Sequence, residues 1–185
     1  MAHLDIDGRR VEVVQGSITK ISAEAIVNAA NEWLIPGGGV DGAIHGAGGP
    51  AILADLCSRY GDDRHCPTGD AVVTIAGNLP ARWVIHAVGP VWEGGLRGER
   101  ELLASAYRAS LAHADALGAR SITFPAISCG VFGYPLPDGA RVALETVRAH
   151  LADGHPTSIT KATFVLLTEG TLGTFEHELG RLPTG

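Results

Sequence analysis

Positive charge is scarce in this chain of 185 residues, which carries a formal net charge of −6. Because non-specific nucleic-acid binding needs a basic surface, this charge argues against that function. It does not exclude a small anionic ligand, since oriented backbone N–H groups supply a local positive potential whatever the net charge.

Cysteines are also few, and long apolar runs are missing. The three cysteines, Cys57, Cys66 and Cys129, are odd in number and irregularly spaced, unlike a disulfide framework. No uncharged run is long enough to cross a membrane, and the first ten residues carry Asp5 and Asp7 instead of the apolar stretch of a signal peptide. We therefore expect a reduced, cytoplasmic protein with no membrane partner.

Three familiar motifs are absent as well. Neither Cys-x-x-Cys nor His-x-x-x-His occurs, and His65-Cys66 has no metal-like spacing, so we expect no metal ion and no cofactor. The P-loop pattern Gly-x-x-x-x-Gly-Lys-Ser/Thr is missing, which argues against NTP hydrolysis of that type. A Gly-x-Gly-x-x-Gly motif does not follow the first predicted strand, as it would in a dinucleotide-binding fold.

Glycine, by contrast, is abundant. The 25 glycines cluster without a regular repeat, which excludes a collagen-like chain. Hydrophobic residues make up 45% and charged residues 18% of the sequence, so the chain can bury a core. Its length suits a single domain spanning residues 1–185.

Apolar periodicity predicts strands alternating with helices. The predicted strands are 11–14, 25–30, 69–76, 82–88, 121–127 and 163–167. The predicted helices are 40–47, 50–60, 99–117, 137–151 and 172–182. This order is typical of an α/β fold with a mainly parallel sheet covered on both faces, in which ligands bind beyond the carboxyl ends of the strands. We expect residues 93–100 to form the most mobile surface loop.

Two glycine-rich loops follow predicted strands. The first, from Asn28 to His45, combines two amides, three consecutive glycines, the carboxylate of Asp41 and one imidazole. The second, 128–134, reads Ser-Cys-Gly-Val-Phe-Gly-Tyr. Glycines let the backbone approach a ligand closely, and their N–H groups ahead of a helix bind anions. The pair predicts a ligand with more than one phosphate, held by backbone amides.

These segments resemble those of macrodomains and, more narrowly, of the MacroD-type ADP-ribosyl hydrolases (O-acetyl-ADP-ribose deacetylase-like). The resemblance covers nearly the whole chain in order. It rests on the segments Asn-Ala-Ala-Asn (28–31), Gly-Gly-Gly-Val-Asp-Gly-Ala-Ile-His (37–45), Ala-Gly-Gly-Pro (47–50), Cys-Pro-Thr-Gly (66–69), Val-Ile-His-Ala-Val-Gly-Pro (84–90) and Phe-Pro-Ala-Ile-Ser-Cys-Gly-Val-Phe-Gly-Tyr-Pro (124–135). It implies a three-layer α/β/α sandwich with a mixed, mainly parallel sheet and a cleft for ADP-ribose.

By matching position, the resemblance implies two catalytic residues. Asn31 would orient the distal ribose, and Asp41 would activate or position the attacking water. Phe132 would pack against the distal ribose, and Ile18 would lie near the adenine. The ligand-binding candidates are Ser17, Ile18, Asn28, Gly38, Gly39, Val40, His45, Ser128, Cys129, Gly130, Val131, Phe132, Gly133 and Tyr134.

The chain departs from the family pattern at the adenine end. Ser17 stands where the family usually has an acidic residue that accepts a hydrogen bond from the adenine amine. A serine accepts without charge, and a charge-assisted hydrogen bond is roughly twice as strong as a neutral one. Leu167 and Thr168 lie about where an aromatic residue often stacks on the adenine. The chain is therefore expected to bind ADP-ribose weakly or to take its specificity from the distal end.

Each candidate in the first loop also has a structural interpretation. Asp41 could simply pair with a helix dipole, but we favour function because the amides accompany it. We interpret His45 as an anchor of the loop through hydrogen bonds rather than as a general acid or base. Asn31 could be a turn residue, and we expect Asn28 to brace the loop through backbone hydrogen bonds.

Two further residues are interpreted structurally. His86 alternates with Val84 and Val88 along a predicted strand, so we expect a hydrogen-bonded core histidine. A cysteine nucleophile needs a base and a lowered pKa, and the sequence identifies neither for Cys129, so we expect its backbone rather than its thiol to contribute to the site.

The sequence thus predicts a hydrolase of ester-linked ADP-ribose. Its substrates would be O-acetyl-ADP-ribose or proteins mono-ADP-ribosylated on Asp or Glu, and we expect a monomer. Two alternatives stay open: a binding module that recognises ADP-ribose without turnover, and a hydrolase of another ADP-ribose derivative.

Overall fold

A mixed sheet of seven strands runs through the computed structural model, which describes residues 2–152, 154 and 156–183. Across the sheet the order is β1-β2-β7-β6-β3-β5-β4. The strands are β1 (Ala2–Ile6), β2 (Arg9–Gln15), β3 (Ala25–Ala29), β4 (Ala71–Ile75), β5 (Trp83–Ala87), β6 (Ser121–Phe124) and β7 (Lys161–Leu166). The five central strands are parallel, and β1 and β4 pair antiparallel at the two edges. The predicted mainly parallel sheet is confirmed.

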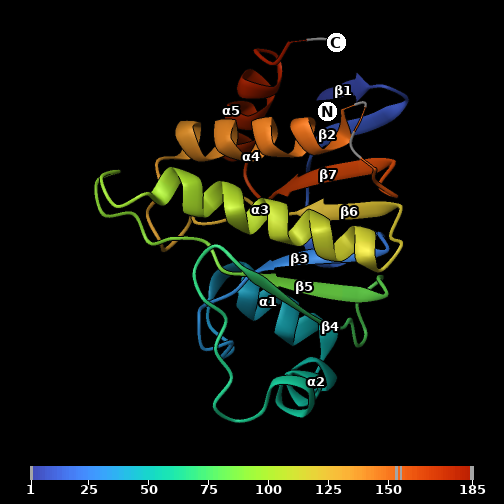
Figure 1. Ribbon diagram of the computed structural model, residues 1–185, viewed down its shortest axis with the longest axis vertical. Coiled ribbons are helices and arrows are strands. Elements are labelled where there is room, and N and C mark those ends of the chain that lie inside the picture. The colour runs from blue at the N-terminus through green and yellow to red at the C-terminus, as the bar shows by residue number, and fades with distance from the viewer. Residues whose placement is uncertain (1, 153, 155, 184–185) are drawn as a thin grey trace.

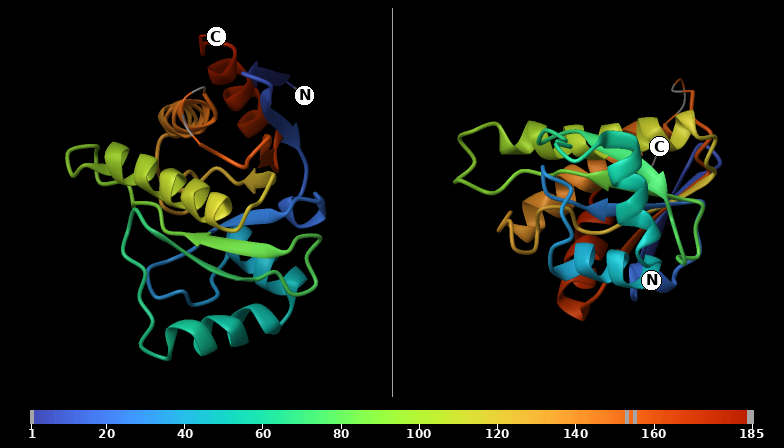
Figure 2. Two further views of the ribbon diagram at one scale, coloured as in Figure 1. Left: turned by 45° about the vertical axis from the view of Figure 1, so that its right-hand side comes forward. Right: turned by 90° about the horizontal axis from the view of Figure 1, so that it is seen from below.

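Helices cover both faces of this sheet. They are α1 (Gly39–Gly48), α2 (Ala51–Tyr60), α3 (Glu99–Ala116), α4 (Leu136–Leu151) and α5 (Glu169–Leu179), with a short 3-10 helix η1 (Ile18–Lys20) after β2. α3 and α4 lie side by side in front of the sheet (Figure 1). In the left view of Figure 2, β5 lies between α3 above it and α1 and α2 below it. This layering confirms the expected α/β/α sandwich.

The burial of β3 shows how the layers are held together. All of its first four residues, Ala25 to Asn28, are buried, as expected for a parallel strand covered on both faces. Val27 belongs to the larger core under α3, α4 and α5, where four aromatic rings pack in sequence: Tyr107, Phe124, Phe164 and Phe175. Ile26 faces the smaller core formed with Ile44 of α1 and Ile52 of α2.

The structure corrects two of the predicted elements. β1 was not expected, because only Leu4 and Ile6 of this short edge strand are buried and its other side chains are polar or small. The last helix begins at Glu169, not at Leu172. The Thr168 side chain accepts a hydrogen bond from the Thr171 N–H at 3.2 Å and so caps an earlier turn.

Within the described residues, the longest helices are too short or too polar to cross a membrane.

Candidate functional site

A cleft of about 600 Å³ lies along the edge where the five parallel strands end. Its walls come from segments that directly follow β2, β7, β6, β3 and β5, together with the start of α1 and the first turns of α4 and α5. Its volume is in the range of small-molecule sites, about 300–1,000 Å³. The parallel topology thus brings together residues that are far apart in the sequence.

Most of the predicted site residues line this cleft. They are Ser17, Ile18, Asn31, Gly38, Gly39, Val40, Asp41, Ser128, Cys129, Gly130, Val131 and Phe132. Four candidates are not among the lining residues: Asn28, His45, Gly133 and Tyr134.

Asp41 is buried in the first turn of α1, with 6% of its surface exposed. Its Oδ2 accepts the Gly37 N–H at 2.5 Å, and its Oδ1 accepts the Asn28 side-chain amide at 2.6 Å. Each carboxylate oxygen keeps a further lone pair, so the group can still accept a proton or a hydrogen bond from a molecule in the cleft. Gly39, with φ at +57°, takes the left-handed conformation that starts this helix.

Behind Asp41, the Asn28 amide makes hydrogen bonds to side chains, so the prediction that it braces the loop through backbone hydrogen bonds is wrong. Its Nδ2 also lies 3.1 Å from Nδ1 of His86. His86 is 1% exposed, and its Nε2 lies 2.9 Å from the Thr74 hydroxyl, as expected for a hydrogen-bonded core histidine. Burial, assisted by the nearby His45, lowers the pKa of His86 to about 3, so the ring is neutral at physiological pH.

His45 lies one turn after Asp41 on α1. Its Nε2 is 3.6 Å from Asp41 Oδ1, too long for a hydrogen bond. Within the described residues, the predicted anchoring of the loop by a His45 side-chain hydrogen bond is not seen. The imidazole instead lies beside the carboxylate, with its ring centroid 5.9 Å from that of His86.

The side chain of Asn31 closes a turn at the mouth of the cleft. Its Nδ2 donates to the Ile35 carbonyl at 2.7 Å, and its Oδ1 accepts the Ile35 N–H at 3.2 Å. Both atoms retain capacity for one more hydrogen bond, because the amide has two N–H donors and its oxygen two lone pairs.

The loop 128–134 presents unused hydrogen-bond donors. Among the described residues, the N–H groups of Gly130, Val131 and Phe132 have no protein acceptor, and the buried Ser128 hydroxyl has no partner. The N-terminus of α1 likewise has no side-chain cap. Backbone donors gathered in this way form a binding site for an anion.

Other donors of the loop are used internally. The Cys129 N–H donates to the Ala126 carbonyl at 3.2 Å, so this donor is used within the loop, although Cys129 lines the cleft. Burial raises the pKa of the Cys129 thiol to about 12, which disfavours a nucleophilic thiolate near neutral pH. Gly133 and Tyr134 close the loop by donating to Gly130 and Ser128 at 2.9 and 3.0 Å.

The segment before α3 supports this loop from behind. The Trp92 N–H donates to the Phe132 carbonyl at 2.8 Å, and its ring packs edge-on against Tyr134. Glu99, 2% exposed, accepts the N–H groups of residues 93, 95 and 97 at 3.0, 3.0 and 2.7 Å. Burial opposes the ionisation of Glu99, but these hydrogen bonds outweigh it and lower its pKa to about 2. The mobility predicted for residues 93–100 stays a prediction, but their backbone is tied to Glu99.

The β2/β7 end of the cleft is apolar and uncharged. Ile18, Val165 and Leu167 line it, and the Ser17 hydroxyl lies 2.8 Å from that of Thr19. Leu167 is 75% exposed, so its side chain is available to a planar ligand group.

Sequence reasoning missed several wall residues. Gly89 follows β5, and a Cβ at this position would lie 2.2 Å from Ser128 Oγ and 2.5 Å from Ile127 Cγ2. Leu136 and Thr171 come from the first turns of α4 and α5. The Gly-Pro step after a strand was the only signal for Gly89, and no local pattern marks the other two.

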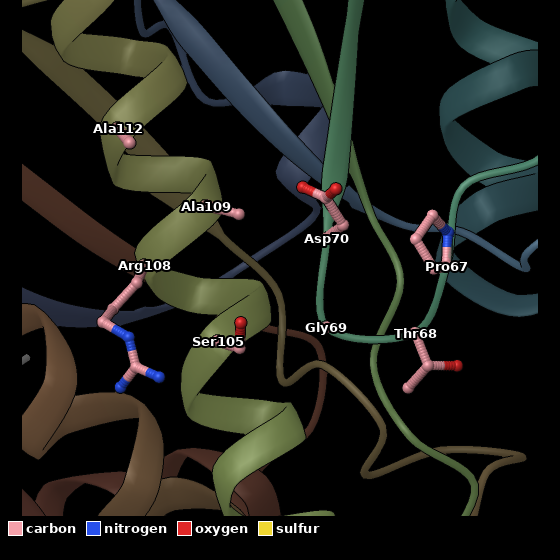
Figure 3. A pocket seen from close by; sticks show the side chains of 8 residues that line it. All are labelled: Pro67, Thr68, Gly69, Asp70, Ser105, Arg108, Ala109 and Ala112. Carbon is pink, nitrogen blue, oxygen red and sulfur yellow. The ribbon is translucent and has the colours of Figure 1, made fainter.

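A second hollow, open and of about 540 Å³, lies between the loop before β4 and α3. In Figure 3, Arg108 points away from the loop. The Thr68 hydroxyl donates a hydrogen bond to the Glu32 carboxylate at 2.7 Å, and Arg108 forms an ion pair with Glu101. This hollow shares no residue with the cleft. Across the described residues, no group of three or more His, Cys, Asp or Glu is arranged to hold a metal ion.

A family model for the macro domain matches residues 27–143, which include Asp41, the loop 128–134 and most of the cleft. The chain belongs to the macro domain family. An O-acetyl-ADP-ribose deacetylase of Klebsiella pneumoniae is 49% identical over 172 residues, covering 93% of this chain and 97% of that protein. The predicted resemblance is thereby confirmed.

Solved macrodomains share the fold described above. The Oceanobacillus iheyensis macrodomain with ADP superposes with a TM-score of 0.90 at 37% identity, covering 97% of this chain and 95% of that one. The Trypanosoma brucei macrodomain in complex with ADP-ribose has a TM-score of 0.79 at 38% identity, covering 90% of this chain and 68% of that one.

Proposed function

We propose that this macrodomain is a hydrolase that cleaves an ester on the distal ribose of ADP-ribose. Its substrates would be O-acetyl-ADP-ribose and proteins mono-ADP-ribosylated on Asp or Glu. The observation that carries the proposal is the Asp41 carboxylate, fixed by two hydrogen bonds in the wall of a cleft that also presents unused backbone N–H groups. The Klebsiella pneumoniae relative, named as such a deacetylase, supports it.

The cleft matches the parts of ADP-ribose in order. The adenine would lie at the apolar end between Ile18 and Leu167, and the diphosphate would accept the N–H groups of residues 130–132 and of the α1 N-terminus. The distal ribose would then reach Asn31 and Asp41. The solved relatives with ADP and with ADP-ribose support this choice of ligand.

In the proposed reaction, water adds to the ester carbonyl. The free lone pair of an Asp41 oxygen accepts the water proton as the water oxygen bonds to the carbonyl carbon. The bond from that carbon to the ribose oxygen then breaks, and Asp41 returns the proton to the ribose oxygen, which leaves as a hydroxyl. Asn31 holds the ribose, and the loop amides offset the desolvation of the diphosphate. Because these groups are already fixed by the fold, positioning and electrostatics supply most of the rate.

The test compares the wild type with Asp41→Ala. Each protein is incubated with O-acetyl-ADP-ribose and with a glutamate-ADP-ribosylated protein, and released ADP-ribose or acetate is followed by chromatography. We expect turnover to fall at least 100-fold in the variant, while calorimetric binding of ADP, which has no distal ribose, is retained. Asp62→Ala, on an exposed turn after α2, is the matched control.

Two other outcomes would contradict the proposal. Turnover by Asp41→Ala at the wild-type rate would remove Asp41 from the mechanism. Absence of turnover in the wild type, with binding of ADP-ribose intact, would favour a module that recognises ADP-ribose without cleaving it, or a hydrolase of a different derivative.

A further inference from the structure

A series of buried, hydrogen-bonded side chains, Thr74, His86 and Asn28, runs from the sheet to Asp41. Asn28 on β3 and His86 on β5 are register partners, and Thr74 lies on the neighbouring strand β4. All three are at most 1% exposed. None of them lines the cleft, so none can touch a ligand directly.

One assignment of donors and acceptors satisfies all of these hydrogen bonds. The Thr74 hydroxyl donates its single proton to the Ile75 carbonyl at 3.0 Å and accepts a hydrogen bond from His86 at 2.9 Å, which places the imidazole proton on Nε2. In the neutral ring, Nδ1 is then a bare lone pair, 3.1 Å from the Asn28 amide nitrogen. The opposite assignment would put a proton on Nδ1, facing the Asn28 amide N–H.

The same logic fixes the amide of Asn28. Its two N–H groups point to His86 Nδ1 and to Asp41 Oδ1, at 3.1 and 2.6 Å. The reverse orientation would place the amide oxygen against the carboxylate, where both atoms are acceptors. The Asn28 Oδ1 is buried with no partner in the described part of the chain, so these two acceptors alone hold the amide.

We propose that His86 is a positioning residue for Asp41: in its Nε2–H form it fixes the Asn28 amide, which in turn directs one N–H onto Asp41 Oδ1. This inference rests on the proposed function only for its catalytic consequence. A proton on Nδ1 would turn that nitrogen into a donor and rotate the amide, and Asp41 would then face the Asn28 oxygen. The carboxylate would lose its orientation toward the ester, while the other residues of the cleft wall would keep their positions.

Thr74→Val tests this series of hydrogen-bonded side chains at the residue farthest from Asp41. The substitution keeps the shape of the side chain and removes the acceptor that holds the His86 proton on Nε2. Thr123→Val is the matched control, because Thr123 is a buried strand residue whose hydroxyl has no partner within the described residues. Replacing His86 itself is less informative, since a fully buried site can fail to fold.

Two measurements are made on each protein. Nitrogen-15 NMR of the ring reports which nitrogen of His86 carries the proton. Steady-state kinetics on O-acetyl-ADP-ribose, with calorimetric binding of ADP, separates positioning from folding. In the wild type and Thr123→Val we expect the Nε2–H form. In Thr74→Val we expect kcat to fall about 10- to 100-fold, the loss typical of a misplaced catalytic group, with KM and ADP affinity within about two-fold.

The inference is overturned by a proton on Nδ1 in the wild type, or by a wild-type kcat in Thr74→Val. A parallel loss of ADP affinity in Thr74→Val would also overturn it, since that would indicate damage to the fold. If the wild type turns over no ester, the proposed function fails. The NMR result would still decide whether His86 orients Asn28.

Discussion

Gly89→Ala offers a sharp test of how the fold builds the anion site. Gly89 follows β5 and lies directly against the loop that begins at Ser128. The added methyl would come 2.2 Å from Ser128 Oγ and 2.5 Å from Ile127 Cγ2. Ser128 is itself in the left-handed region, with φ at +65°, so its backbone has little freedom to move aside.

The size of the effect follows from this geometry. Ordinary contact would require the Ser128 and Ile127 side chains, or the loop that carries them, to retreat by roughly 1 Å, and overpacking of this kind costs about 1–3 kcal/mol of folding free energy. For a protein of this length, each kcal/mol lowers the Tm by about 2–4 °C. Displacement of one loop amide from a phosphate loses about 1.5–3 kcal/mol of binding, so we expect the Kd for ADP to rise about 10- to 100-fold.

The assay combines a thermal melt with calorimetric titration of ADP. Gly173→Ala makes the same chemical change in the middle of α5, where an added Cβ meets nothing within 4 Å, and should be neutral or stabilising. A Gly89→Ala protein that melts with the wild type and binds ADP with unchanged affinity would refute the close approach of β5 to the loop.

Three further predictions follow from the site. Ser17→Asp should tighten ADP-ribose binding several-fold by adding a charged acceptor at the adenine end, and a calorimetric titration with equal or weaker affinity would contradict it. Glu99 has a folded pKa of about 2, below its ordinary value of 4.5, so its stabilisation is present above pH 4.5 and is lost as the pH falls toward 2. Glu99→Gln should therefore reduce the loss of unfolding free energy between pH 4.5 and pH 2, as measured by denaturant unfolding at each pH. Glu101→Gln, at an exposed position, should not change it. His86 has a folded pKa of about 3 against 6.5 for the free group, so the unfolded chain binds its proton first and stability falls from about pH 6.5 down to about pH 3; NMR titration of its ring should show it neutral at pH 5, and a protonated ring there would contradict the burial argument.

Much of the architecture could be predicted from the sequence because buried parallel strands and the helices between them have recognisable apolar patterns. Strands such as 25–29 are short apolar runs, and the helices between them carry regular apolar spacing, so their order fixed the fold class. Helix and strand ends were less accessible. The start of α5 depends on a hydrogen bond from Thr171 to the Thr168 side chain, which apolar spacing does not reveal.

The site residues also fall into those that a local sequence pattern predicts and those that only the fold brings together. Asp41 and its glycines lie within one short segment, so their association was visible as a pattern. Gly89 and Thr171 reach the cleft only because β5 and β7 end at the same edge. The partner of Asn28 was misjudged for a related reason: His86 is 58 positions away, and only the pairing of β3 with β5 makes them neighbours.

That pairing links the stability of the sheet to the chemistry of the cleft. Along β3, Ile26 and Asn28 point to the α1 face, and along β5, Val84 and His86 do the same. A slip of one residue in this register would turn Asn28 toward the larger apolar core and leave its amide unpaired there. The buried polar chain therefore penalises the wrong register as well as orienting Asp41. Thr74→Val should accordingly affect catalysis more than stability, because it removes one buried hydrogen bond beyond His86 but leaves the register of β3 with β5 unchanged.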